Sequence, residues 1–324
     1  MTTIKTFCMT VALTIMSTTC AIAEMPVVKA SVLKFGTVNW ELTTIQSKGF
    51  DTENGFTLEV QGVAGGSAAK VAFQAGETDV IVTDWLWVAR QRAAGKDYVF
   101  LPYSKAVGSV MVSADSPAKT IADLEGSKIG IAGGSLDKSW LILRAYAEQK
   151  HGMDLKATTE QVFGAPPLIM KSALQGETDG AINFWHYLAK MEASGMRPLI
   201  SVSDAATELG LNPEIPLLGY VFHGDYLREF PERVAGLAAA SRATKDLLGN
   251  EDAAWDDLRA KMKPANDAEF VALIDGFRKG IPTTYDVDQD GANGMLQLMS
   301  DLGGTELVGD VSSVPEGLFI NPLQ

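Results

Sequence analysis

Short apolar runs alternate with longer amphipathic segments along most of this chain of 324 residues. The apolar runs predict strands at residues 27–37, 56–60, 80–83, 107–113, 128–132, 180–183, 199–202 and 217–222. Apolar spacing of the helical kind predicts helices between them, clearest at 68–74, 137–150 and 231–248. Strands that alternate with helices indicate an α/β protein with largely parallel sheets.

One part of this pattern occurs twice, one hundred residues apart. The sequence Gly-Glu-Thr-Asp at 76–79 returns at 176–179, and at the same offset Trp85 is matched by Trp185. Such a period is too long for a solenoid and suits a duplicated β-α-β unit. We therefore predict two similar α/β lobes, with the Gly-Glu-Thr-Asp turns at the strand ends away from the ligand.

The expected ligand site follows from this duplication. Ligands of open α/β sheets bind beyond the carboxyl ends of the strands, where helix N-termini offer free N–H groups. Two such edges that face each other form a cleft. We place lobe 1 at residues 24–110 and 215–324 and lobe 2 at 111–214, with hinge segments at 107–113 and 213–220.

The first residues have the pattern of a secretory signal peptide. Lys5 precedes an apolar stretch at 7–16, and the small-x-small sequence of residues 21–23 predicts cleavage after Ala23. A lipoprotein in which Cys20 is the anchored residue is the alternative. Both outcomes direct the chain out of the cytoplasm, and we expect a periplasmic protein.

Composition then excludes several classes of function. Cys8 and Cys20 are the two cysteines of the chain, so the predicted mature part has no thiol nucleophile and no disulfide. The formal net charge of −13 and the lack of basic clusters argue against nucleic acid binding. No apolar run after the signal approaches about 18 residues, so we expect no membrane-spanning segment.

The sequence contains little that supports a metal site or a cofactor site. Asp286, Asp288, Asp290 and Gly291 match the first half of a calcium loop, but its twelfth position is Gln297 in place of a bidentate carboxylate. The three histidines lack ligand spacing. We expect no metal, no cofactor and no catalytic residues.

Three phrases carry a resemblance to a known family: Phe-Gln-Ala-Gly-Glu-Thr-Asp at 73–79, Ile-Ala-Asp-Leu-Glu-Gly-Ser-Lys-Ile-Gly at 121–130 and Ala-Leu-Gln-Gly-Glu-Thr-Asp at 173–179. With the signal and the two lobes, the chain resembles periplasmic solute-binding proteins of nitrate, sulfonate and taurine ABC importers. That family also contains proteins that bind pyrimidine precursors of thiamine. The resemblance implies a type II periplasmic-binding-protein fold, two lobes joined by two crossing segments that close on a ligand.

The resemblance also implies which residues line the ligand site. In lobe 1 these are Asn39, Trp40, Gly66, Ser67, Asp84 and Trp85, with Tyr220 on the returning strand. In lobe 2 they are Gly134, Ser135, Leu136, Asn183, Phe184 and Trp185. We expect Trp85 and Trp185 to face each other across the cleft, although core packing explains aromatic residues equally well.

The implied function is that of a binding protein without enzymatic activity. It would capture a small solute by hinge closure, as a monomer, and deliver it to a permease driven by an ATPase. Helix N-termini favour a sulfonate, whereas tryptophans beside Asp84 favour an amine or a nitrogen heterocycle. A periplasmic sensor partner of a membrane receptor is the alternative, and an enzyme related to pyrimidine synthases is a third interpretation.

Overall fold

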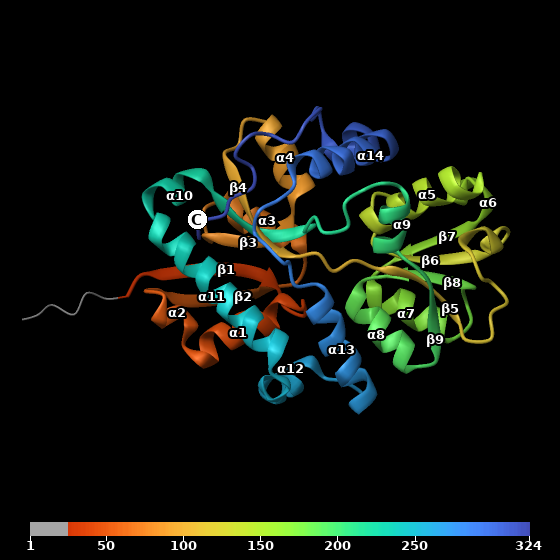
Figure 1. The fold of residues 1–324 in the computed structure, drawn as a ribbon, viewed down its shortest axis with the longest axis horizontal. Coiled ribbons are helices and arrows are strands. Elements are labelled where there is room, and N and C mark those ends of the chain that lie inside the picture. The colour runs from red at the N-terminus through yellow and green to blue at the C-terminus, as the bar shows by residue number, and fades with distance from the viewer. Residues whose placement is uncertain (1–24) are drawn as a thin grey trace, which may run out of the picture.

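The structure is a computed structural model that describes residues 25–324. The predicted signal peptide, its cleavage site and Cys20 lie outside these residues. Two five-stranded sheets form two lobes that lie side by side, with helices on both faces of each sheet (Figure 1). The predicted α/β fold with two lobes is confirmed.

The sheet of lobe 1 has the strand order β2-β1-β3-β10-β4. Its strands are β1 (Val27–Leu33), β2 (Thr57–Val63), β3 (Val80–Asp84), β4 (Tyr98–Ser104) and β10 (Leu218–His223). β1 runs parallel to β2 and β3, whereas β10 is antiparallel to both of its neighbours. The carboxyl ends of β1, β2 and β3 therefore lie at one edge, as a ligand site of this fold requires.

The helices of lobe 1 come from both ends of the described chain. They are α1 (Val38–Lys48), α2 (Phe50–Glu53), α3 (Gly66–Gln74), α4 (Trp85–Ala93), α10 (Gly224–Glu229), α11 (Pro231–Asn250), α12 (Arg259–Met262), α13 (Asp267–Lys279) and α14 (Gln289–Val308), with a 3-10 helix, η2 (Asp252–Leu258). The predicted helix at 231–248 is α11, which begins with Pro231 in its first turn and packs on α1.

Lobe 2 repeats this plan with the strand order β7-β6-β8-β5-β9. Its strands are β5 (Ser109–Ser113), β6 (Lys128–Ala132), β7 (Glu160–Gly164), β8 (Gly180–Asn183) and β9 (Met196–Ser201). Its helices are α5 (Lys138–His151), α6 (Leu155–Thr158), α7 (Pro166–Leu174), α8 (Trp185–Ala193) and α9 (Val202–Glu208), with a 3-10 helix, η1 (Ile121–Leu124). The duplication in the sequence is therefore a duplication of strand order.

The Gly-Glu-Thr-Asp turns are structural, as predicted. Asp79 accepts a hydrogen bond from the backbone N–H of Lys29 at 2.8 Å, and Asp179 accepts the equivalent bond from Lys128 at 2.8 Å. Each turn thus holds the start of one strand against its neighbour in the sheet, β3 against β1 and β8 against β6. Both lie at the strand ends opposite to the edge that faces the other lobe.

Two segments cross between the lobes. The first connects β4 to β5 through residues 105–108, and the second runs from the end of α9 to β10. The predicted hinge at 107–113 is too long, because residues 109–113 are strand β5, paired on both sides within the second sheet. The same pairing places the predicted boundary at residue 110 inside a strand.

The C-terminal helices also connect the lobes. α13 packs against α8, and α14 packs against both α4 and α5. In Figure 1 these two blue helices lie on opposite sides of the crossing segments. Within residues 25–324, no helix is both long and apolar enough to cross a membrane.

Candidate functional site

The two lobes meet at an ion pair between the end of a strand and the start of a helix. Asp84 is the last residue of β3, and one carboxylate oxygen accepts a hydrogen bond from the N–H of Trp87 at 2.9 Å. Its other oxygen lies 3.3 Å from the ammonium nitrogen of Lys138, the first residue of α5 in lobe 2. The predicted site residue Asp84 therefore lies where the lobes touch.

A second lysine lies close to this pair. Lys70 of α3 holds its ammonium 4.9 Å from the ring centre of Trp87. Burial lowers the pKa of Lys70, and Asp84 opposes that effect. Burial would raise the pKa of Asp84, but Lys138, Lys70 and the N–H of Trp87 together lower it. Asp84 therefore stays ionised, with Lys138 in direct contact and Lys70 nearby.

Two helix N-termini accompany the lysines. Ser67 lies in the first turn of α3, and Gly134 and Ser135 precede α5. These three residues are exposed, and a Cβ atom at Gly134 would meet no atom within 4 Å. Asp137 caps α5 through the N–H of Trp140 at 3.2 Å, and burial raises its pKa. The N-terminus of α3 has no side-chain cap, so its free N–H groups suit an anion, whereas the carboxylate of Asp137 occupies that of α5.

Asn39 and Asn183 have structural roles in this arrangement. The amide of Asn39 donates to the carbonyl oxygens of Leu33 and Gly36 at 2.7 and 2.8 Å, which shapes the loop between β1 and α1. Asn183 is 1% exposed and donates to the carbonyl of Pro166 at 2.9 Å. Each side chain therefore holds backbone of its own lobe.

Trp85 and Tyr220 do not reach the cleft, and their predicted places there are wrong. Trp85 is fully buried in lobe 1, where its ring centre lies 5.6 Å from that of Phe319. Tyr220 is also fully buried and donates a hydrogen bond to Glu41 at 2.7 Å. Trp85 therefore cannot face Trp185 across the cleft, because it contributes to the core of its own lobe.

The remaining predicted residues have mixed environments. Phe184 is 38% exposed at the start of α8, Leu136 is half-buried against the core, and Gly66 is half-buried at the start of α3. Trp40 is buried and meets Trp185 edge to face, with ring centres 5.7 Å apart. This aromatic pair is a second contact between the lobes.

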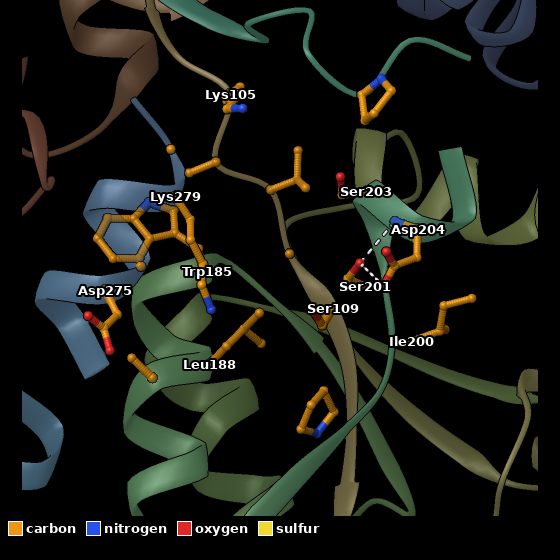
Figure 2. A pocket seen from close by; sticks show the side chains of 18 of the residues that line it. Lys105, Ser109, Trp185, Leu188, Ile200, Ser201, Ser203, Asp204, Asp275 and Lys279 are labelled. Carbon is orange, nitrogen blue, oxygen red and sulfur yellow. Dashed lines mark hydrogen bonds between the residues drawn. The ribbon is translucent and has the colours of Figure 1, made fainter. Parts of the chain in front are cut away.

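A large open cavity lies elsewhere. It encloses about 700 Å³ along the crossing segments, between α8 and β9 of lobe 2 and α13 of lobe 1 (Figure 2). Of the predicted site residues, Trp185 alone lines it. The rim of this cavity consists mainly of exposed charged side chains, including Asp275 and Lys279. The sheet edges are the better candidate site, because helix N-termini and lysines lie there.

Sequence reasoning missed Lys70 and Lys138. A signal for Lys138 was present, since a cation in the first turn of a helix opposes the helix dipole and is unfavourable without a partner. Lys138 directly follows Asp137 at that position. Its partner Asp84 comes from the other lobe, and no sequence pattern indicates that pairing.

Comparison with known proteins identifies the family. The family model described as NMT1/THI5 like matches residues 41–254. The chain belongs to this family. The resemblance derived from the sequence, to nitrate, sulfonate and taurine binding proteins and their pyrimidine-binding relatives, is thereby confirmed. A search of curated protein sequences found no match.

Solved structures show the same fold at low sequence identity. The periplasmic aliphatic sulphonate binding protein SsuA from Escherichia coli is 19% identical, with a TM-score of 0.71 over 91% of this chain and 92% of that chain. SsuA from Xanthomonas axonopodis pv. citri, bound to MOPS, is 15% identical, with a TM-score of 0.67 over 90% and 97%. The desulfurization enzyme DSZB is 16% identical, with a TM-score of 0.55 over 90% and 97%.

Proposed function

We propose that this protein is the periplasmic substrate-binding component of an ABC importer. It captures one small organic solute between its lobes and delivers it to a permease driven by an ATPase. Family membership and the fold shared with sulfonate-binding proteins support this role. The two crossing segments support closure by a hinge, in which ligand binding selects the closed arrangement.

The observation that carries the ligand class is the cluster of Lys70, Asp84 and Lys138. Two ammonium groups lie near the ionised carboxylate of Asp84 at the start of α5, and burial raises the pKa of the neighbouring Asp137 and so disfavours a second negative charge there. We infer an organic anion, such as a sulfonate, as the solute. The sequence-based argument for an amine loses its support, because Trp85 is buried and Asp84 already pairs with Lys138.

A thermal-shift screen of sulfonates, nitrate, pyrimidines and amines tests this function. A ligand that binds the folded state at a hundredfold excess over Kd adds about 2.7 kcal/mol to stability. We expect organic sulfonates to raise Tm, and Lys138→Gln to weaken that rise. Lys171→Gln, at an exposed lysine of α7, is the matched control. A response to amines alone would overturn the inferred class.

The proposed location and state have their own test. We propose export with cleavage after Ala23 and a monomeric mature protein. Mass spectrometry of the secreted protein should then find Glu24 as its first residue, and light scattering should give the mass of one chain. A lipid-modified Cys20 at the N-terminus would contradict the cleavage site.

A further inference from the structure

Trp185 extends from lobe 2 into a recess of lobe 1. It is the first residue of α8, yet its indole packs against Trp40 of α1, with ring centres 5.7 Å apart at 90°. The indole lies next to α13 of lobe 1, as Figure 2 shows. Trp185 also packs on the aromatic cluster that Trp255 and Phe277 form in lobe 1.

The recess is shaped for a ring at Gly276. A Cβ atom at this position would lie 2.6 Å from Cε3 and 2.8 Å from Cζ3 of Trp185. Gly276 lies in the interior of α13, where glycine destabilises a helix relative to alanine. The missing side chain provides the space in which the flat face of an aromatic ring approaches the helix.

A small polar cavity adjoins the edge of this ring. It holds about 10 Å³ and has polar groups from Thr37, Tyr103, Ser104 and Lys245 in its wall. Phe277, Gly280 and Ile281 form the apolar part of the wall, and Trp185 is the one lining residue from lobe 2. Lobe 1 therefore supplies the whole pocket, and lobe 2 supplies the ring that fills it.

The polar wall is held by a buried ion pair. The ammonium of Lys245 lies 2.7 Å from the carboxylate of Glu41, and the two side chains are 5% and 0% exposed. Tyr220 and Ser241 donate to the same carboxylate at 2.7 and 2.6 Å. A buried ion pair adds little net stability compared with apolar residues. We therefore explain this pair by its effect on the cavity wall, where it fixes the position of the Lys245 ammonium.

Two groups at the cavity can donate a hydrogen bond toward a ligand: the phenol of Tyr103 and the ammonium of Lys245, which also donates to Glu41 and Ser241 at 2.7 and 2.6 Å. The Lys245 ammonium lies 4.7 Å from the ring centre of Tyr103. Burial holds the pKa of Tyr103 well above its ordinary value, with Glu41 adding to the effect, so the phenol keeps its proton. A ring that enters the recess meets these donors at its edge, which suits a ring carrying a hydrogen-bond acceptor.

We propose that the recess of Trp40, Gly276 and Phe277 is a ring-binding subsite between the two lobes, which Trp185 fills in the structure described here. Its occupant is the planar ring of a solute with an acceptor at the edge that faces Tyr103 and Lys245. The proposal rests on the proposed function and narrows it from organic solutes to those with a planar ring. Trp185 then competes with the ligand for the recess, as a side chain of the same protein.

The test displaces the indole in two ways. Trp185→Ala removes the indole. Gly276→Ala keeps the indole but adds a methyl group at the position that the ring occupies. Gly294→Ala is the matched control, because a Cβ there meets Leu211 at an ordinary 3.8 Å inside helix α14. Calorimetry then measures binding of quinoline, whose ring nitrogen accepts a hydrogen bond, and of indole, which only donates one.

We expect Trp185→Ala to bind quinoline at least tenfold more tightly than the parent and the Gly294→Ala control do. Quinoline should bind that variant several-fold more tightly than indole, and adding the pair Glu41→Gln and Lys245→Met should remove this preference. In Gly276→Ala, tryptophan fluorescence should shift to the red, because the indole of Trp185 moves out of the recess into water. Phe35→Ala, which removes an exposed aromatic side chain of lobe 1, should change none of these measurements.

Three outcomes would overturn the subsite. They are equal binding of quinoline by the parent and by Trp185→Ala, equal binding of quinoline and indole by that variant, and fluorescence of Gly276→Ala identical to that of the control. Failure of the proposed function has a different signature. In that case no solute of the thermal-shift screen raises the Tm of the parent, whatever the ring probes do in the variants.

Discussion

The two copies of the repeat place the same residue in opposite environments. Trp85 and Trp185 each open a helix, α4 in lobe 1 and α8 in lobe 2, and Trp185 is separated from its strand by Phe184 alone. Trp85 is fully buried within its own lobe, whereas Trp185 is half-buried and packs on the other lobe. The repeated tryptophan therefore has the same place in the secondary structure and different tertiary contacts.

The C-terminal segment accounts for this difference. The backbone N–H of Phe100 in β4 donates to the carbonyl of Leu318 at 2.7 Å, and that of Ile320 donates to the carbonyl of Phe100 at 2.9 Å. This pairing sets Phe319 against Trp85 and closes the core over it. The segment comes from outside the repeat, so a duplicated motif predicts elements better than it predicts what covers them.

Replacing each tryptophan with alanine gives the largest expected contrast. Trp85→Ala leaves a large buried cavity and should cost about 3 to 5 kcal/mol of unfolding free energy. Trp185→Ala should cost about 1 to 2 kcal/mol, because its side chain is partly exposed and sits between lobes. Chemical denaturation followed by circular dichroism measures both. Equal losses would show that the two positions are equivalent after all.

Local patterns of this sequence predicted the elements well. The strand at 80–83, the helix at 231–248 and the Gly-Glu-Thr-Asp turns depend on neighbouring residues, and the structure contains all three. The site was harder to predict. The contact of Lys138 with Asp84 joins two lobes, and the burial of Trp85 depends on Phe319, so both require knowledge of how distant segments pack.

The next position of the repeat contrasts Leu86 with His186. Leu86 is fully buried, and burial followed by repulsion from Lys190 lowers the pKa of His186 from 6.5 to about 4. The unfolded chain therefore takes up a proton at this residue near pH 6.5, whereas the folded protein does so only near pH 4. Stability is full above pH 6.5 and falls by up to about 3 kcal/mol as the pH drops through this window.

His186→Leu, which copies the residue of the other lobe, should abolish this part of the acid sensitivity. Urea denaturation at pH 7 and at pH 4.5 measures the change, and His151→Leu at an exposed histidine is the control. A pH dependence of the His186 variant that matches the parent would contradict the assignment.

The two helix starts give a smaller contrast. Asp84 and Phe184 occupy the N-cap with nearly the same backbone, φ −81° and ψ 148° against φ −73° and ψ 147°. Asp84 accepts a hydrogen bond from the helix, and Phe184 cannot. Asp84→Ala should therefore cost more than the about 1 kcal/mol of a lost cap, because Lys138 also loses its partner, and Phe184→Asp should add about 1 kcal/mol by capping α8. Thermal unfolding measures both, and a destabilised Phe184→Asp would show that α8 cannot use a cap.

The smallest contrast lies in the turns that the two copies share most closely. The hydroxyl of Thr78 donates to the carbonyl of Lys29 at 2.7 Å, whereas the hydroxyl of Thr178 is buried and has no hydrogen-bond partner among the residues that the structure describes. Valine has the same shape without the hydroxyl. Thr78→Val should cost about 0.5 to 1 kcal/mol, because a hydrogen bond is lost, and Thr178→Val should be neutral or slightly stabilising, because an unsatisfied polar group is removed. Parallel denaturation curves of the two variants measure the difference, and an equal cost at both positions would mean that Thr178 has a partner, such as a bound water molecule, in solution.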